Sequence, residues 1–340
     1  MAPHSRRDVL SYGVGATALV GMAGCMSTDS NSLSFASGWS ENDWRSEAVE
    51  RHFMDRVNEH ADEEVEWEYH PDQQLGGFEE MHQLVQGGSV DMAITLPPYL
   101  PGSYQLSEVG LIPGLVTDQK SASESFWRLL SPEQDGTLFE EEFEPNGLRP
   151  VMASQVYPAE LCMGSERIET IDEVEGKLIR TSGSIGEWTV NAMGASPVTM
   201  SGSEVYNALD QGTIEGTISP LTVLNSSSQH EVINYMTEDL KIQSFPEVYS
   251  MNVDSWNNLS DGTQEAFITA ADEVITNRHD AMMDKVESDR EAIGDSIEYY
   301  SVDDPNAWEN QLSSVQDRWI ESFDDQELAE TVLEKFGSEA

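Results

Sequence analysis

The sequence predicts an α/β protein with two sheets, crossover helices and a helical C-terminal segment. Three observations support this class. Strand-like alternation and helix-like spacing of apolar residues follow one another through residues 33–95. The same succession returns in residues 149–253, and beyond residue 261 only helical spacing remains. The chain of 340 residues is long enough for about two domains of roughly 150 residues each.

The first succession is delimited by residues that stop regular structure. Residues 65–69 alternate between apolar and polar side chains, as a half-buried strand does. Gly87 and Gly88 provide a left-handed cap for the helix before them, and Pro97 and Pro98 end a strand. The predicted elements are a strand at 33–37, a helix at 44–57, a strand at 65–69, a helix at 78–87 and a strand at 91–95.

The second succession contains more strands, and long helices follow it. Ser203 is a helix-opening residue, and Gly194 ends the helix before it. The predicted elements are strands at 149–156, 159–163, 178–181, 197–200, 213–218 and 248–253, helices at 187–193, 203–209 and 261–293, and a final helix with Trp308, Leu312, Val315 and Trp319 on one face.

The charge balance excludes some functions and indicates a salt-rich environment. The chain has 63 acidic and 17 basic residues, a formal charge of -46. This disfavours binding to nucleic acid or to an acidic membrane surface, because both need clustered Lys and Arg. The acidic residues repel one another at low ionic strength, whereas molar salt shortens the Debye length to about 3 Å. We interpret the composition as adaptation to high salt, as in halophilic archaea; an acidic protein from an ordinary bacterium is the alternative.

The N-terminus is predicted to be an export signal. Arg6 and Arg7 precede a short uncharged stretch, which is typical of Tat export. Residues 21–25 resemble a lipobox that ends in Cys25, the residue that would carry the lipid; an ordinary cleaved signal with a chance Cys is the alternative. If Cys25 is lipidated, only Cys162 remains, and no intrachain disulfide is possible. The predicted boundaries are a signal over 1–24 and a polar tether over 25–32.

No constellation of catalytic residues stands out in the sequence. A nucleophile elbow, a phosphate loop, a zinc helix with paired His and a Cys-His arrangement are all missing. Acidic runs such as 140–142 are typical of solvated helix faces, and none has the spacing of a calcium loop. We therefore expect no cofactor, no metal and no enzymatic activity, and we favour a binding protein.

Two blocks of sequence resemble the solute-binding proteins of TRAP transporters (the DctP family). The blocks are residues 74–77 and 84–93 in the first half, and 172–181 (with Glu-Gly-Lys-Leu-Ile-Arg-Thr), 194–198 and 203–216 (beginning Ser-Glu-Val-Tyr) in the second. The second block is the more specific because its three pieces keep a fixed order. The resemblance covers most of residues 34 to about 270, and the N-terminus makes it that of a haloarchaeal-type lipoprotein.

The resemblance implies a type II-like periplasmic-binding-protein fold, in which two α/β lobes surround a cleft and crossing strands form a hinge. It implies an extracytoplasmic receptor that carries a small organic acid to a membrane permease of small and large subunits. With the export signal, we expect this receptor to be lipid-anchored at the cell surface. A two-lobe protein serving a sensor kinase or another permease class, and a secreted enzyme on the same fold, are the alternatives. The expected parts are lobe I at 33–150 with a return segment at about 245–290, lobe II at 151–244, and a helical segment at 291–340.

Arg180 is the residue to which the resemblance assigns the ligand's carboxylate. In this family the Arg of the Lys-Leu-Ile-Arg strand typically forms a two-pronged salt bridge with the ligand, and here that strand is 177–180. A planar guanidinium matches a carboxylate. Pairing of Arg180 with a neighbouring acid is the alternative; between residues 151 and 240 the only other basic residues are Arg167 and Lys177.

The chain departs from the sialic-acid and C4-dicarboxylate members of the family at three positions. Glu160 lies near the place of a second Arg, Gly202 replaces a Phe, and Ser219, itself a candidate contact, replaces an Asn. One anionic clamp is left, so we expect a monocarboxylate with a larger or more polar body. The further candidate contacts, for each of which core packing is the alternative, are Trp39, Gln74, Tyr99, Gln155, Tyr157 and Trp188.

Overall fold

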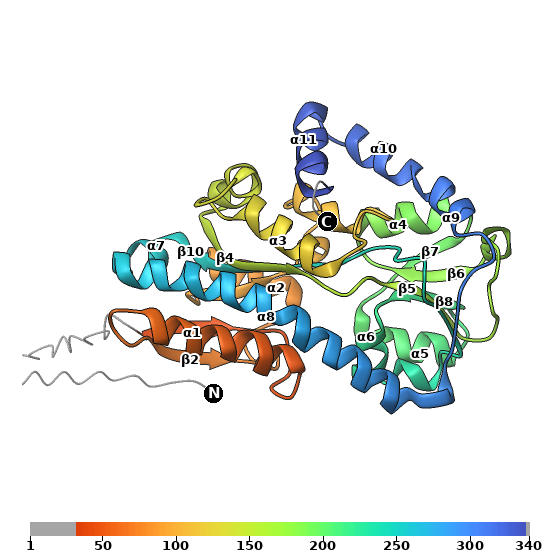
Figure 1. Ribbon diagram of the computed structural model, residues 1–340, viewed down its shortest axis with the longest axis horizontal. Helices are drawn as coiled ribbons and strands as arrows, with labels where there is room; N and C mark the ends of the chain where they lie inside the picture. The colour runs from red at the N-terminus through yellow and green to blue at the C-terminus, as the bar shows by residue number, and fades with distance from the viewer. Residues whose placement is uncertain (1–31, 338–340) are drawn as a thin grey trace, which may run out of the picture. The chain divides into compact units, whose positions relative to one another are not determined.

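The computed structural model describes residues 32–337, which contain two sheets joined by crossing connections (Figure 1). The predicted signal at 1–24 and all but the last residue of the predicted tether lie outside the described residues. Within 32–337, no helix is both long enough and apolar enough for a membrane crossing. The two mixed sheets, each with covering helices, confirm the predicted α/β class. We call the two halves the first and second lobe.

The first sheet consists of β1 (Ser32–Ala36), β2 (Glu66–His70), β3 (Met92–Thr95), β4 (Leu148–Gln155) and β10 (Pro246–Asn252). Its strand order is β2-β1-β3-β10-β4. β1 lies parallel to β2 and β3, with Phe35 opposite Tyr69 and Met92. β10 runs antiparallel between β3 and β4, and its Val248 lies opposite Thr95. The three predicted strands of the first succession thus form one parallel unit.

The chain crosses twice between the sheets, after β4 and before β10. The two crossing connections are hydrogen-bonded to each other. The Val156 amide donates to the Phe245 carbonyl (2.9 Å), and the Ala159 amide donates to the Gln243 carbonyl (2.8 Å). The expected lobe boundary at residue 150 falls inside β4, and all of β4 pairs within the first sheet.

The second sheet consists of β5 (Glu160–Met163), β6 (Leu178–Thr181), β7 (Ser196–Thr199), β8 (Gly216–Ser219), β9 (Tyr235–Thr237) and β11 (Glu298–Tyr300). Its order is β11-β9-β5-β8-β6-β7. β6 lies parallel to β7 and β8, whereas β5 is antiparallel to β8 and β9. β11 was not predicted, so the expectation that everything beyond residue 261 is helical is wrong. Tyr300 explains the strand, since its buried hydroxyl accepts a hydrogen bond from the Ile168 amide (3.0 Å) and aromatic residues favour strands.

Helices cover both sheets. They are α1 (His52–His60), α2 (Phe78–Gln86), α3 (Gln119–Leu130), α4 (Gly183–Ala192), α5 (Val205–Asp210), α6 (Leu221–Ser226), α7 (Val253–Asn257), α8 (Asp261–Ile293), α9 (Pro305–Leu312), α10 (Ser314–Glu321) and α11 (Gln326–Gly337). Short 3₁₀ or π turns named below are η1 (Ser46–Arg51), η2 (Pro97–Tyr99), η3 (Leu106–Leu111) and η7 (Gly202–Glu204).

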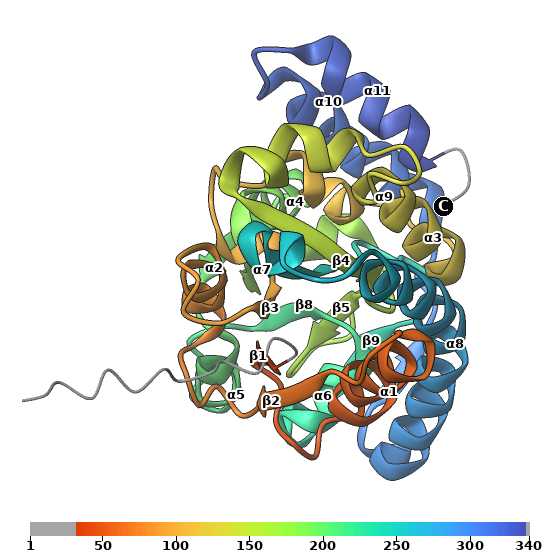
Figure 2. The same cartoon turned by 90° about the vertical axis from the view of Figure 1, so that its left-hand side faces the viewer.

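The long helix α8 contacts both lobes. It packs against α1 and β4 of the first lobe and against α6 of the second (Figure 2). Ser260 caps its first turn by accepting a hydrogen bond from the Thr263 amide (3.1 Å). At 1.5 Å per residue, this helix is about 50 Å long. The predicted helix over 261–293 is confirmed.

The predicted final helix is two helices, α9 and α10. Between them, the hydroxyls of Ser313 and Ser314 donate to the carbonyls of Asn310 (2.8 Å) and Gln311 (3.1 Å). Serine hydroxyls that bind backbone carbonyls compete with the helical pattern. The four apolar residues expected on one face are buried in different cores: Trp308 and Leu312 in the second lobe, Val315 and Trp319 in the first.

Gly216 tests the packing at the centre of the second sheet. A Cβ there would lie 2.5 Å from the sulfur of Met163 and 2.6 Å from the carbonyl oxygen of Cys162, so Gly216→Ala forces β8 away from β5. We expect the substitution to lower the free energy of unfolding by roughly 1–3 kcal/mol, as overpacked cores do, in denaturant titrations at molar KCl. Gly202→Ala is the control, because no atom lies within 4 Å of its Cβ site. Equal effects of the two substitutions would contradict this packing.

Candidate functional site

The ends of strands from the two sheets meet at Gly183 and Pro98. Gly183 follows β6 and begins α4, with a φ of 68° that favours glycine. Pro98 lies in η2, directly after β3. A Cβ at Gly183 would lie 3.3 Å from the Pro98 carbonyl oxygen. This close approach brings the segment that carries Arg180 to the turn that carries Tyr99, at the junction of the two lobes.

Arg180 carries a half-buried guanidinium without an acidic partner. Its Nε and Nη2 donate to the carbonyl oxygen of Met200 at 3.3 and 3.0 Å. Among residues 32–337 it makes no ion pair, whereas Arg167 pairs with Glu298 (2.9 Å) and Lys177 with Glu166 (2.5 Å). In this acid-rich chain, the alternative in which Arg180 is neutralised by a neighbouring acid does not fit these contacts.

Four half-buried rings form a strip in the first lobe, which we call the aromatic strip. It contains Trp39, Phe78, Tyr99 and Phe245, whose successive centroids lie 4.6, 6.3 and 5.5 Å apart. The rings come from the loop after β1, the start of α2, η2 and the residue before β10. Gly38 is required beside them, because a Cβ there would lie 2.2 Å from the Phe78 ring.

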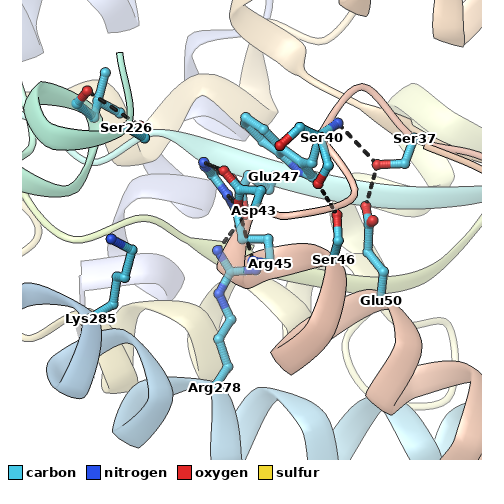
Figure 3. Close-up of polar contacts among 12 residues, drawn as sticks. Ser37, Ser40, Asp43, Arg45, Ser46, Glu50, Ser226, Glu247, Arg278 and Lys285 are labelled. Atoms are coloured by element: carbon cyan, nitrogen blue, oxygen red, sulfur yellow. Dashed lines mark hydrogen bonds and ion pairs between the residues drawn. The ribbon is translucent and has the colours of Figure 1, made fainter. Parts of the chain in front are cut away.

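A buried ionic network fixes the first ring of the strip. The guanidinium of Arg45 lies 3.4 Å above the centre of the Trp39 ring. Asp43 accepts two hydrogen bonds from it, both 2.8 Å, and Glu247 of β10 accepts a third at 3.4 Å. Arg278 of α8 pairs with the other oxygen of Glu247 (Figure 3). Burial lowers the pKa of Arg45, but the hydrogen bond and charge of Asp43 outweigh it, and the pKa is raised.

Sequence reasoning missed Arg45 and Arg278, although one signal was present. Arg278 lies four residues after Val274 and four before Met282, both buried, so it is a charge on the apolar face of a helix. A buried charge needs a partner. Nothing in the sequence near Arg278 shows that the partner is Glu247 on a strand.

Glu50 lies beside this network and is fully buried. Its two oxygens accept hydrogen bonds from the Ser37 hydroxyl (2.7 Å) and the Tyr69 hydroxyl (2.5 Å). Burial raises the pKa of Glu50 to about 7, although both hydrogen bonds act in the opposite direction. Ser37 directly follows β1, so the proton on Glu50 is coupled to the same strand end that carries Trp39.

Two predicted contact residues are packed away from the lobe junction. Gln155 is fully buried, and its side-chain oxygen would lie 2.3 Å from a Cβ at Gly110, so it packs on η3. Its carbonyl oxygen accepts a hydrogen bond from Gln119 (2.7 Å). Trp188 of α4 lies under the guanidinium of Arg318 of α10, 4.7 Å from its ring centre. Both side chains have a structural explanation that does not involve a ligand.

The other predicted contacts have mixed surroundings. Tyr157 is half-buried against the second lobe's core, and burial and the charge of Glu160 raise its pKa. Ser219 is buried at the end of β8, where its carbonyl oxygen accepts a hydrogen bond from the Cys162 thiol (3.6 Å). Gln74 is exposed in the turn after β2. Of the predicted residues, Arg180, Trp39 and Tyr99 lie on the segments that approach one another at the junction.

Glu160 is committed to its own lobe. It accepts hydrogen bonds from the Thr237 hydroxyl (2.5 Å) and from the amides of Leu240 (3.2 Å) and Lys241 (3.0 Å). Burial raises its pKa. The position near which relatives carry a second Arg therefore holds a carboxylate with internal donors. Gly202 begins η7, and no atom lies within 4 Å of its Cβ site.

Metal binding has no support in the described part of the chain. Residues 32–337 contain no group of three or more His, Cys, Asp or Glu side chains arranged to hold a metal ion. The site offers an unpaired guanidinium and aromatic rings, which suit binding rather than a chemical step.

The pKa of Glu50 predicts a pH dependence of stability. The folded state retains a proton that the unfolded state loses above its pKa of 4.5, so stability falls as pH rises from 4.5 to about 7 and is level above. We expect the wild type to lose up to about 3 kcal/mol of unfolding free energy relative to Glu50→Gln across this range. Denaturant titrations at pH 4.5 and 8 measure the difference. The control is Glu47→Gln, an exposed acid of the same segment; parallel pH profiles of wild type and Glu50→Gln would contradict the assignment.

Solved structures with the same fold include solute-binding proteins of TRAP transporters. A marine metagenome TRAP protein specific for aromatic acid ligands, in complex with metahydroxyphenylacetate, has a TM-score of 0.80 at 19% identity, covering 91% of this chain and 99% of that chain. A protein from Chromohalobacter salexigens with bound D-glucuronate has a TM-score of 0.77 at 20% identity, covering 89% and 99%. These likenesses confirm the expected two-lobe periplasmic-binding-protein fold.

Curated relatives and a family model cover most of the chain. Uncharacterized protein YiiZ of Salmonella typhimurium is 26% identical, over 74% of this chain and 77% of the relative. The 2,3-diketo-L-gulonate-binding periplasmic protein YiaO of Escherichia coli is 25% identical, over 71% and 72%. The model of the DctP family, "Bacterial extracellular solute-binding protein, family 7", matches residues 35–322. The chain therefore belongs to family 7 of the extracellular solute-binding proteins.

Proposed function

We propose that this protein is the lipid-anchored receptor of a TRAP-type uptake transporter, and that it binds a small organic acid between its lobes and delivers it to a membrane permease. The observation that carries the proposal is the guanidinium of Arg180. It is half-buried beside the lobe junction, and its hydrogen-bond partner within residues 32–337 is a neutral carbonyl. A positive charge in such a place is matched by an anion from outside the chain.

The chemistry of a guanidinium selects a carboxylate. Its planar donors form two parallel hydrogen bonds to one carboxylate, and such charge-assisted pairs are stronger than neutral ones. The solved relatives named above hold metahydroxyphenylacetate and D-glucuronate, and the relative from Escherichia coli is named for 2,3-diketo-L-gulonate. Each of these compounds carries a carboxylate, which supports an acid as the ligand here.

Closure over the ligand uses the two crossing connections as a hinge. Both connections are short, and they are paired by the hydrogen bonds between Val156 and Phe245 and between Ala159 and Gln243. Hinge closure of two lobes around a solute removes water from the contact. We expect this to strengthen the interaction of the ligand with Arg180, because charges attract more strongly in a dry site.

High salt resolves a conflict between the charge of the protein and an anionic ligand. A body with a formal charge of -46 repels an acid at long range. In molar salt the screening length of about 3 Å removes this repulsion, while the short contact at Arg180 persists. Capture then depends on contact geometry rather than on attraction at a distance, as suits a halophile.

The proposal of a cell-surface location rests on the sequence alone. Arg6 and Arg7 fit a Tat signal, and Cys25 lies where a lipoprotein carries its lipid. The polar residues 27–32 would hold the folded lobes away from the membrane. Tat export passes folded proteins, which suits a chain that folds in cytoplasmic salt.

The role of Arg180 is tested by a thermal-shift screen of organic acids in several molar KCl. We expect at least one acid to stabilise the wild type. Arg180→Ala should weaken its binding by at least about 100-fold, since two charge-assisted hydrogen bonds are lost. Arg180→Lys keeps the charge without the paired geometry and should lie between. Arg167→Ala, which removes an arginine already paired with Glu298 in the same lobe, is the control. An undiminished shift in Arg180→Ala would remove Arg180 from the site.

The anchor is tested in cells with the variant Cys25→Ser. We expect the wild type to sediment with membranes and to be released only by detergent, whereas Cys25→Ser appears in the medium or the aqueous fraction. The second cysteine is the control, since Cys162→Ser alters a buried residue and should not change the fractionation. Membrane association of Cys25→Ser equal to that of the wild type would contradict lipidation at this residue.

A further inference from the structure

We infer that the acid held by Arg180 carries an aromatic ring, and that the aromatic strip of the first lobe binds this ring. The inference rests on the proposed function and narrows it to one ligand class. It is carried by the juxtaposition of Arg180, on β6, with the strip that contains Tyr99.

The aromatic strip is built from segments that are distant in sequence. Trp39, Phe78, Tyr99 and Phe245 are each packed partly against the core, and each retains exposed surface. Aromatic rings prefer partners at centroid distances of about 4.5–7 Å, and the strip already has this spacing. A contiguous apolar surface of this kind marks a binding site more often than a plain surface.

The position of the strip matches the length of a small aromatic acid. One end is Phe245, whose carbonyl oxygen is hydrogen-bonded to Val156 in the hinge. Tyr99 directly follows Pro98, which touches Gly183 three residues after Arg180. The strip therefore extends from the hinge to the place where the second lobe approaches. A carboxylate on Arg180 leaves the rest of the ligand against these rings.

The ring that begins the strip is held rigidly. Arg45 covers Trp39 at 3.4 Å, and Asp43 and Glu247 hold Arg45. The indole Nε1 of Trp39 is buried and has no hydrogen-bond partner among residues 32–337. One such donor suits a ring with a single acceptor substituent, such as a hydroxyl group, better than an unsubstituted ring.

A polyhydroxylated acid fits the site less well. Its several hydroxyl groups need several hydrogen-bond partners, and burying them without partners is costly. The polar candidates for this task are occupied or distant. Glu160 is bound to donors of its own lobe, Gln155 packs on Gly110, and Gln74 is exposed in a turn.

The test compares four acids by isothermal titration in several molar KCl: benzoate, 3-hydroxybenzoate, cyclohexanecarboxylate and D-glucuronate. We expect both aromatic acids to bind at least about tenfold more tightly than D-glucuronate, and benzoate more tightly than its saturated analogue. Tyr99→Leu should weaken benzoate binding by about 5- to 10-fold. Phe245→Leu is the second variant, should Tyr99→Leu fail to fold. Trp188→Leu, which removes a ring packed under Arg318, should leave binding unchanged.

The outcomes separate the ligand class from the receptor function. Tighter binding of D-glucuronate, lost in Arg180→Ala and unaffected by Tyr99→Leu, would overturn the aromatic class and leave the receptor intact. Equal binding of benzoate and cyclohexanecarboxylate would show that the strip is only an apolar surface and would also overturn it. Failure of Arg180→Ala to weaken any acid would overturn the proposed function itself.

Discussion

The pairing of the two crossing connections is the constraint on which the rest of the molecule depends. β4 and β10 are antiparallel neighbours in the first sheet, and β5 and β9 are antiparallel neighbours in the second. The bridge between Ala159 and Gln243 links these pairs, so one two-stranded ribbon passes through both lobes. Because this ribbon fixes how the sheets face each other, the strand end of β3 meets the strand end of β6. Neither Arg180 nor the aromatic strip would form a site within its own lobe.

Charge distribution distinguishes Arg180 from the other buried or half-buried cations. Arg45 and Arg278 share Glu247, and Lys285 pairs with Asp289 on its own helix. In a chain with 63 acidic residues, an arginine finds an acid unless the fold keeps acids away. Around Arg180 the partner is the carbonyl oxygen of Met200. The fold has therefore preserved one cation for an anion that is not its own.

The sequence predicted the parts of this fold that local pattern controls. The helix over 261–293 and the strand at 178–181 match the structure, because apolar spacing and terminal residues determine them. β9 and β11 were missed because each has three residues and exists through pairing with a strand that is distant in sequence. The break at Ser313 depends on side-chain hydrogen bonds, which periodicity does not reveal.

The candidate site was predictable to a smaller extent. Arg180 follows from the resemblance, and Trp39 and Tyr99 follow from their places after strands. Phe78 and Phe245 were missed, since only the folded chain shows that their rings continue the same strip. Trp188 has the right residue type, but α10, which packs on α4, occupies its ring. Partners contributed by distant segments decide such cases.

The helix α8 has a consequence for how this receptor moves. A single uninterrupted helix that packs on α1, β4 and α6 resists sliding of one lobe along the other, because every sideways step would break contacts at both of its ends. Rotation about a line close to the helix disturbs far fewer of them. The molecule is thus built as a door with one jamb: it swings about a single axis and does not drift.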